Sequence, residues 1–69
     1  MVDLELLAKT VEDHGVTINW LCNKANIKRG TWYSRINGVG DFTAPEIEGI
    51  VAALRLTNKQ RDEIFFAKR

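Results

Sequence analysis

The sequence contains one cysteine, one proline and one histidine among 69 residues, and these scarcities exclude several classes of protein. A single cysteine, Cys22, cannot form an internal disulfide bond, so the chain is not a disulfide-stabilised secreted miniprotein. Cys22 and His14 alone cannot complete a closed zinc site, so we expect no metal and no other cofactor. One proline and five glycines are too few for a collagen-like repeat or a disordered linker.

Long apolar runs are also missing. No stretch approaches the roughly 20 apolar residues that span a bilayer, and the opening MVDLELL is acidic, unlike a signal peptide. We therefore expect a cytoplasmic protein without a membrane partner. Its 69 residues predict a single domain, residues 1–69, too small to enclose a catalytic pocket. The sequence has no nucleophile–base pair, metal cluster or phosphate-binding glycine loop, so we predict no enzymatic activity and no small-molecule substrate.

Charge is unevenly distributed, although the formal net charge is only +1. Residues 1–13 carry a net charge of −3, and residues 41–69 are balanced. Residues 14–40 contain no acidic residue and four bases, which are Lys24, Lys28, Arg29 and Arg35. Such a segment gives a local positive potential that attracts polyanions even when the whole protein is nearly neutral. The same distribution of charge is equally typical of a basic surface patch that binds no ligand.

Apolar residues recur at helical spacing in five short segments. The first segment ends at His14 and at Gly15, a left-handed cap. The second begins at Thr17, an N-cap that follows the staple residue Val16. The third begins near residues 28–30 and ends at residues 37–40. In these three helices, the residues expected to face the core are Leu4, Leu7, Ala8, Val11, Ile18, Leu21, Cys22, Ala25, Trp32 and Ile36.

Two capping boxes begin the last two helices. One is formed by residues 43–46, with Pro45 in the first turn, and the other by residues 57–60. The core-facing residues expected here are Ile47, Ile50, Val51, Leu54, Ile64 and Phe65. Phe66 fits either the core or a contact with a second copy of the chain. No strand-like alternation competes with these helices, so the sequence predicts an all-α, compact five-helix domain.

The second and third helices are separated only by a short turn at residues 25–28. A turn of this length fixes two helices at a steep angle, as in a helix-turn-helix unit, here about residues 17–37. Cys22 is small enough for the point where the helices cross. With Trp32 and Ile36 inward, the outer side of the third helix has cations, hydroxyls and an amide but no carboxylate. Such groups bind phosphate oxygens and read base edges in the major groove.

From about Leu4 to Leu56 the chain resembles the lambda repressor-like, Cro-type helix-turn-helix domain, also called the XRE family. The resemblance lies in residues 15–22, 26–33 and 42–47, and residues 56–67 resemble the last helix of small regulators from phages of Gram-positive bacteria. It implies a phage repressor or Cro-like transcription regulator that acts in a bacterial cytoplasm. Such proteins bind a pseudo-palindromic double-stranded DNA operator as homodimers, with the third helix in the major groove.

The residues above and the resemblance together give a set of candidate DNA contacts. Gly30 belongs to it because a glycine permits close approach of the backbone to a phosphate or base. The predicted DNA-binding residues are Thr17, Lys24, Lys28, Arg29, Gly30, Thr31, Tyr33, Ser34, Arg35 and Asn37.

Departures from the family pattern leave a second hypothesis open. Ile18 stands where the family often has a Gln that reaches a phosphate or base, and Arg35 takes the place of an aliphatic residue, which falls at Ile36 instead. The alternative is an antirepressor or modulator of the same fold that binds a partner repressor protein rather than DNA. Trp20, beside the apolar stripe of the second helix, and Tyr33 are the candidate aromatic anchors for such a contact.

Overall fold

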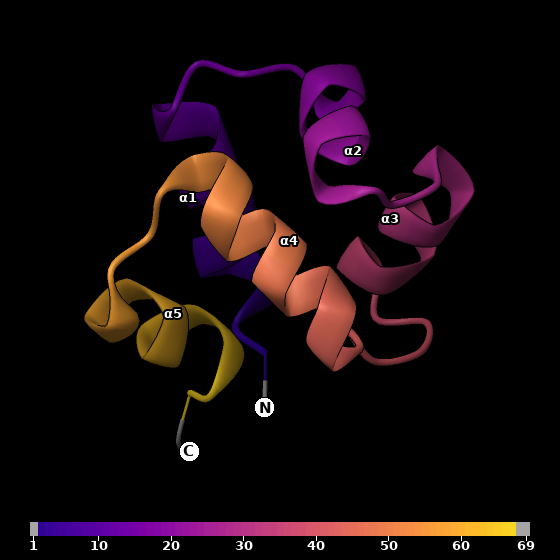
Figure 1. Cartoon of the computed structure of the whole chain (residues 1–69). Helices are drawn as coiled ribbons and strands as arrows, with labels where there is room; N and C mark the ends of the chain where they lie inside the picture. The colour runs from indigo at the N-terminus through magenta and orange to yellow at the C-terminus, as the bar shows by residue number, and fades with distance from the viewer. Residues whose placement is uncertain (1, 68–69) are drawn as a thin grey trace.

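The computed structural model describes residues 2–67, and within this range the chain forms five α-helices and no β-strand (Figure 1). The predicted all-α, five-helix fold is therefore confirmed. No helix in this range has the length and apolar content needed to cross a membrane. The helices are α1 (Leu4–Asp13), α2 (Ile18–Ala25), α3 (Arg29–Ile36), α4 (Ala44–Leu54) and α5 (Asn58–Phe65).

Local signals in the sequence set most of the helix ends. The Thr17 side chain accepts a hydrogen bond from the Trp20 backbone N–H at the start of α2. The capping boxes predicted at Thr43 and Thr57 are both formed, so each satisfies two backbone N–H groups that the helix itself cannot pair. Gly15, with φ of 67°, adopts the left-handed conformation that was expected after α1.

One core lies between the five helices. The expectation that Ala8 faces it is wrong, because Ala8 is exposed and Leu6 packs against the core instead. Leu6 and Ala8 are the two sequence neighbours of the buried Leu7. The helix α1 is therefore rotated slightly about its own axis relative to the predicted orientation. The buried residues are Leu7, Val11, Leu21, Cys22, Ala25, Ile27, Trp32, Phe42, Ile50, Leu54, Leu56, Ile64 and Phe65.

α4 is the element against which α2 is packed, and Gly49 makes their close approach possible. A Cβ atom on Gly49 would lie 2.5 Å from the carbonyl oxygen of Ala25 and 3.0 Å from its Cα atom. A glycine in the middle of a helix costs about 1 kcal/mol of helix stability relative to alanine. Here the missing side chain lets the end of α2, just before the turn to α3, rest directly on α4.

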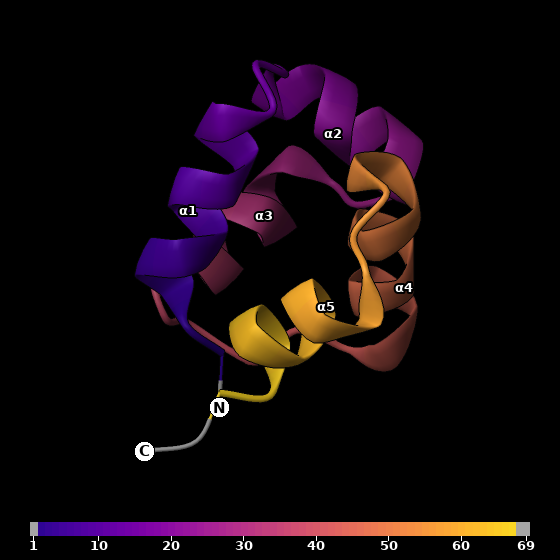
Figure 2. The same ribbon diagram turned by 90° about the vertical axis from the view of Figure 1, so that its left-hand side faces the viewer.

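The two views place α2 and α5 at opposite ends of the molecule (Figures 1 and 2). α1 runs between them, and its beginning is joined to α5 by a hydrogen bond from the Asp3 backbone N–H to the Ile64 carbonyl oxygen at 2.7 Å. Because α2 and α5 lie at opposite ends, a ligand bound to α2 and the adjoining α3 would not meet the surface of α5.

His14 is the C-cap of α1, and its exposed side chain also makes a tertiary contact. Its Nδ1 atom lies 2.7 Å from the carbonyl oxygen of Thr10, and its Nε2 atom lies 3.0 Å from that of Leu54. These oxygens belong to the last turns of α1 and α4. The single histidine of the chain thus joins the C-terminal ends of two helices.

Candidate nucleic-acid interface

The turn between α2 and α3 consists of Asn26, Ile27 and Lys28. Asn26 takes the left-handed conformation, with φ of 57°, which asparagine tolerates better than most residues. The Ile27 backbone N–H donates to the Cys22 carbonyl oxygen at 2.9 Å, and the Ile27 side chain is buried. The turn is therefore anchored at its centre, between the two helices that the sequence predicts on either side of it.

Aromatic packing fixes which side of α3 faces outward. Trp32 is only 2% exposed, and its ring meets the edge of Phe42 with a centroid separation of 6.0 Å. Phe42 in turn contacts Phe65 of α5 at 5.7 Å. Edge-to-face pairs of this kind stabilise a core beyond the area that they bury. Trp32 thus lies inward as predicted, and the opposite side of α3 is left to solvent.

The predicted DNA-binding residues divide into two groups in the structure. Three of them, Thr31, Ser34 and Arg35, are half-buried at the flanks of α3. The others are exposed on α2, the turn and α3, and they are Thr17, Lys24, Lys28, Arg29, Gly30, Tyr33 and Asn37. We call the exposed group the α2–α3 face. No carboxylate occurs among residues 14–40, which contain this whole face.

Two exposed aromatic side chains adjoin these cations. Trp20 on α2 is 39% exposed and Tyr33 on α3 is 46% exposed. The Lys24 Nζ atom lies 5.9 Å from the centre of the Trp20 ring, within the range of a cation–π contact. The Trp20 ring is therefore partly buried, and its exposed part is accessible to a partner.

The N-terminus of α3 has no side-chain cap. Lys28 occupies the N-cap position and makes no side-chain hydrogen bond to the helix. Apart from its chain neighbours and the backbone of α3 itself, no heavy atom lies within 4 Å of the position that a Cβ atom would occupy on Gly30, so packing inside the domain does not require a glycine there. Free backbone N–H groups at a helix N-terminus attract anions, and Lys28 and Arg29 add two positive charges at the same place.

Arg35 occupies a different environment from the other three cations of residues 14–40. Its Nε atom lies 3.4 Å from Oε1 of Glu46, and its Nη1 atom donates to the Val39 carbonyl oxygen at 3.5 Å. The Arg35 and Glu46 side chains are only 23% and 17% exposed. Sequence reasoning missed this ion pair because it identified Glu46 only as part of a capping box. Eleven positions separate the two residues, and nothing in the local pattern links them.

Cys22 faces the core from α2, as the sequence predicts, and is 4% exposed. Burial raises the pKa of the Cys22 thiol, and the nearby Arg29 guanidinium lowers that pKa by a smaller amount. The thiol is therefore neutral near pH 7 and unreactive. Within residues 2–67, no group of three or more His, Cys, Asp or Glu side chains converges on a point where a metal ion could bind.

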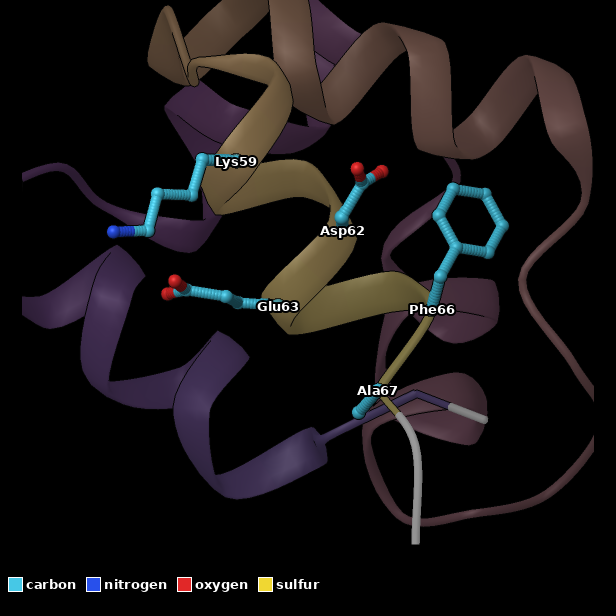
Figure 3. A pocket seen from close by; sticks show the side chains of 5 residues that line it. All are labelled: Lys59, Asp62, Glu63, Phe66 and Ala67. Carbon is cyan, nitrogen blue, oxygen red and sulfur yellow. The ribbon is translucent and has the colours of Figure 1, made fainter.

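A second exposed surface lies on α5, at the other end of the molecule. Phe66 is 53% exposed, so it does not belong to the core. It borders an open hollow that is also lined by Lys59, Asp62, Glu63 and Ala67 (Figure 3). Lys59 and Glu63 extend to one side of α5, and the Phe66 ring points to the other. This surface carries charges of both signs, unlike the α2–α3 face.

Comparisons with protein families, with curated proteins and with solved structures find no match to this chain.

Proposed function

We propose that this protein is a sequence-specific DNA-binding transcription regulator of the lambda repressor-like, Cro type, which places α3 in the major groove of an operator. The observation that carries the proposal is the acid-free α2–α3 face. Lys24, Lys28 and Arg29 are exposed there, on and beside a short helix whose opposite side is anchored by Trp32. A short helix joined to its predecessor by a short turn, with cations on its outer side, fits the groove-reading half of a helix-turn-helix unit.

The residues of this face differ in chemistry, so some suit contacts with phosphates and others suit contacts with bases. Lys24, Lys28 and the free N-terminus of α3 suit phosphate oxygens, which position the protein without reading sequence. Arg29 and Tyr33 extend from the outer side of α3 and suit base edges, and an arginine bonded to the two acceptors of guanine is the commonest specific contact. Loss of one such base contact costs about 1–3 kcal/mol and relaxes the preference at one base pair.

A homodimer on a pseudo-palindromic operator matches the size of the domain. The described part of the chain measures 30 × 24 × 20 Å. The longest of these dimensions, 30 Å, is a little shorter than the roughly 34 Å between half-sites on one side of DNA, so two copies can lie side by side on successive half-sites. The surface around Phe66 suits the contact between copies. It has an exposed aromatic residue and charges of both signs, so it can complement itself across a two-fold axis.

The test of DNA binding is a fluorescence anisotropy titration at several salt concentrations. The probes are a duplex that the protein selects from a random-sequence pool and a random duplex of the same length. A dimer presents six exposed cations from Lys24, Lys28 and Arg29, so we expect log K to fall against log salt with a slope between about −3 and −5. A slope near zero, or equal affinity for the two duplexes, contradicts the proposal.

The second candidate function is capture of a partner repressor protein. It is supported by the exposure of Trp20 and Tyr33, because aromatic anchors dominate many protein interfaces. A variant pair separates the two functions. If DNA is the ligand, Lys28→Ala with Arg29→Ala abolishes regulation in cells and Trp20→Ala largely preserves it. If a protein is the ligand, a folded Trp20→Ala variant is inactive and the double variant is active.

A further inference from the structure

We infer that Arg35 is a positioning residue, which fixes the tilt of α3 through Glu46 instead of contacting DNA. This inference rests on the proposed function and reassigns one residue of the predicted DNA-binding set. Three features of the structure support it. They are the contact of Arg35 with Glu46, the loop that surrounds the guanidinium, and the position of Arg35 in the last turn of α3.

Glu46 holds Arg35 from a position that is itself fixed. Oε1 of Glu46, which lies 3.4 Å from Arg35 Nε, also accepts a hydrogen bond from the Thr43 backbone N–H at 2.9 Å. That second bond closes the capping box of α4. The carboxylate therefore cannot move without breaking its bond in the capping box, and Arg35 is held against the start of α4.

The loop between α3 and α4 is shaped around the Arg35 guanidinium. A Cβ atom on Gly40 would lie 2.6 Å from Arg35 Nη1, so a side chain there would displace the guanidinium. Gly40 also has φ of 77°, a conformation that favours glycine. The Arg35 Nη1 atom donates to Val39, the residue just before this glycine. These contacts use two of the five N–H donors of the guanidinium, and they hold the Arg35 side chain against Glu46 and the loop, where it is 23% exposed.

Arg35 lies in the last turn of α3, where a contact has the largest effect on the tilt of the helix. The other end is held by the turn to α2, and Trp32 anchors the middle. The 8 residues of α3 make a helix about 12 Å long, so a shift of about 1 Å at one end tilts it by about 5°. Binding groups must be held within about 0.5 Å and 10–20° of their working geometry, so the tilt alone is tolerated, whereas the shift of about 1 Å at the C-terminal end of α3 is not. Loss of the tether is therefore expected to weaken base reading more than phosphate binding.

The chain supplies a matched variant that removes the charge of Glu46 and keeps its place in the capping box. Gln60 fills, in the capping box of α5, the place that Glu46 fills in that of α4. Glu46→Gln therefore keeps the cap and removes the charge that holds Arg35. Arg35→Gln removes the other partner. Lys28→Gln is the control for an exposed cation, and thermal melting checks that each variant is folded.

The experiment measures the affinity of each variant for the selected and random duplexes over a range of salt. We expect Glu46→Gln and Arg35→Gln each to reduce the preference for the selected duplex about tenfold, roughly the effect of one lost base contact. The double variant should lose no more than either single variant. The salt slope on the random duplex should stay unchanged in all three. Lys28→Gln should make the salt slope on the random duplex less steep by about 2, because a dimer loses two phosphate contacts.

Two results overturn the inference while the proposed function stands. One is a reduction of the salt slope by Arg35→Gln that matches that of Lys28→Gln, which would make Arg35 a phosphate contact. The other is an unchanged preference in a folded Glu46→Gln variant, which also decides the question if Arg35→Gln does not fold. A parent protein that binds neither duplex instead overturns the proposed function, and the inference with it.

Discussion

Gly49→Ala is expected to destabilise the protein, although alanine is the better helix former. The new Cβ atom would lie 2.5 Å from the carbonyl oxygen of Ala25, where ordinary contacts begin near 3.4 Å, and two further backbone atoms of Ala25 lie within 3.1 Å. Because backbone cannot rotate away as a side chain can, α2 must move by about 1 Å. Overpacking of this kind costs about 1–3 kcal/mol, and contact with three backbone atoms favours the upper half of that range.

The gain in helix propensity offsets only part of this cost. Alanine stabilises the helix interior by about 1 kcal/mol relative to glycine, so the net loss is about 1–2 kcal/mol. For a domain of this size, that lowers the melting temperature by about 5–15 °C. The displaced residue immediately precedes the turn to α3, so DNA affinity should fall as well.

Circular dichroism melts of two matched variants test this reasoning. Gly30→Ala makes the same chemical change in α3, where the new Cβ atom would meet no heavy atom within 4 Å outside its chain neighbours and the backbone of its own helix. It should leave the melting temperature unchanged or raise it by a few degrees. A Gly49→Ala variant that melts at or above the parent would refute the close approach of α2 and α4.

Four other predictions concern the core, the face and the thiol. Trp32→Ala should lower the free energy of unfolding, measured in urea, by about 3–5 kcal/mol, which is a large part of the stability of a small domain. A melting temperature within a degree or two of the parent would mean that Trp32 is exposed. Arg29→Ala should weaken binding to the selected duplex about 10–100-fold and to the random duplex less; equal losses would make Arg29 a phosphate contact. Phe66→Ser should leave the fold intact and shift the sedimentation equilibrium towards monomer, and an unchanged dimer would exclude the surface around Phe66. Iodoacetamide should modify Cys22 slowly at pH 8 until urea unfolds the chain, because burial and a raised pKa both reduce access to thiolate.

The positions of the helices were predictable because their ends are local. A capping box needs only four consecutive residues, so Thr43 and Thr57 marked the starts of α4 and α5 before any tertiary contact was known. The same holds for Asn26, whose left-handed conformation depends on its own side chain and on its neighbours in the turn. The inward orientation of Trp32 was equally predictable, since a large aromatic residue among polar neighbours defines the buried side of a helix.

The sequence by itself thus determined five helices, their caps, the buried side of most of them and the acid-free segment that forms the α2–α3 face. The tertiary structure alone decided the relations between residues distant in the chain. It turned α1 so that Leu6 rather than Ala8 meets the core, brought the Gly49 backbone onto Ala25, and paired Arg35 with Glu46. Periodicity and capping act within one or two turns of a helix, whereas these contacts depend on how separate helices pack in three dimensions.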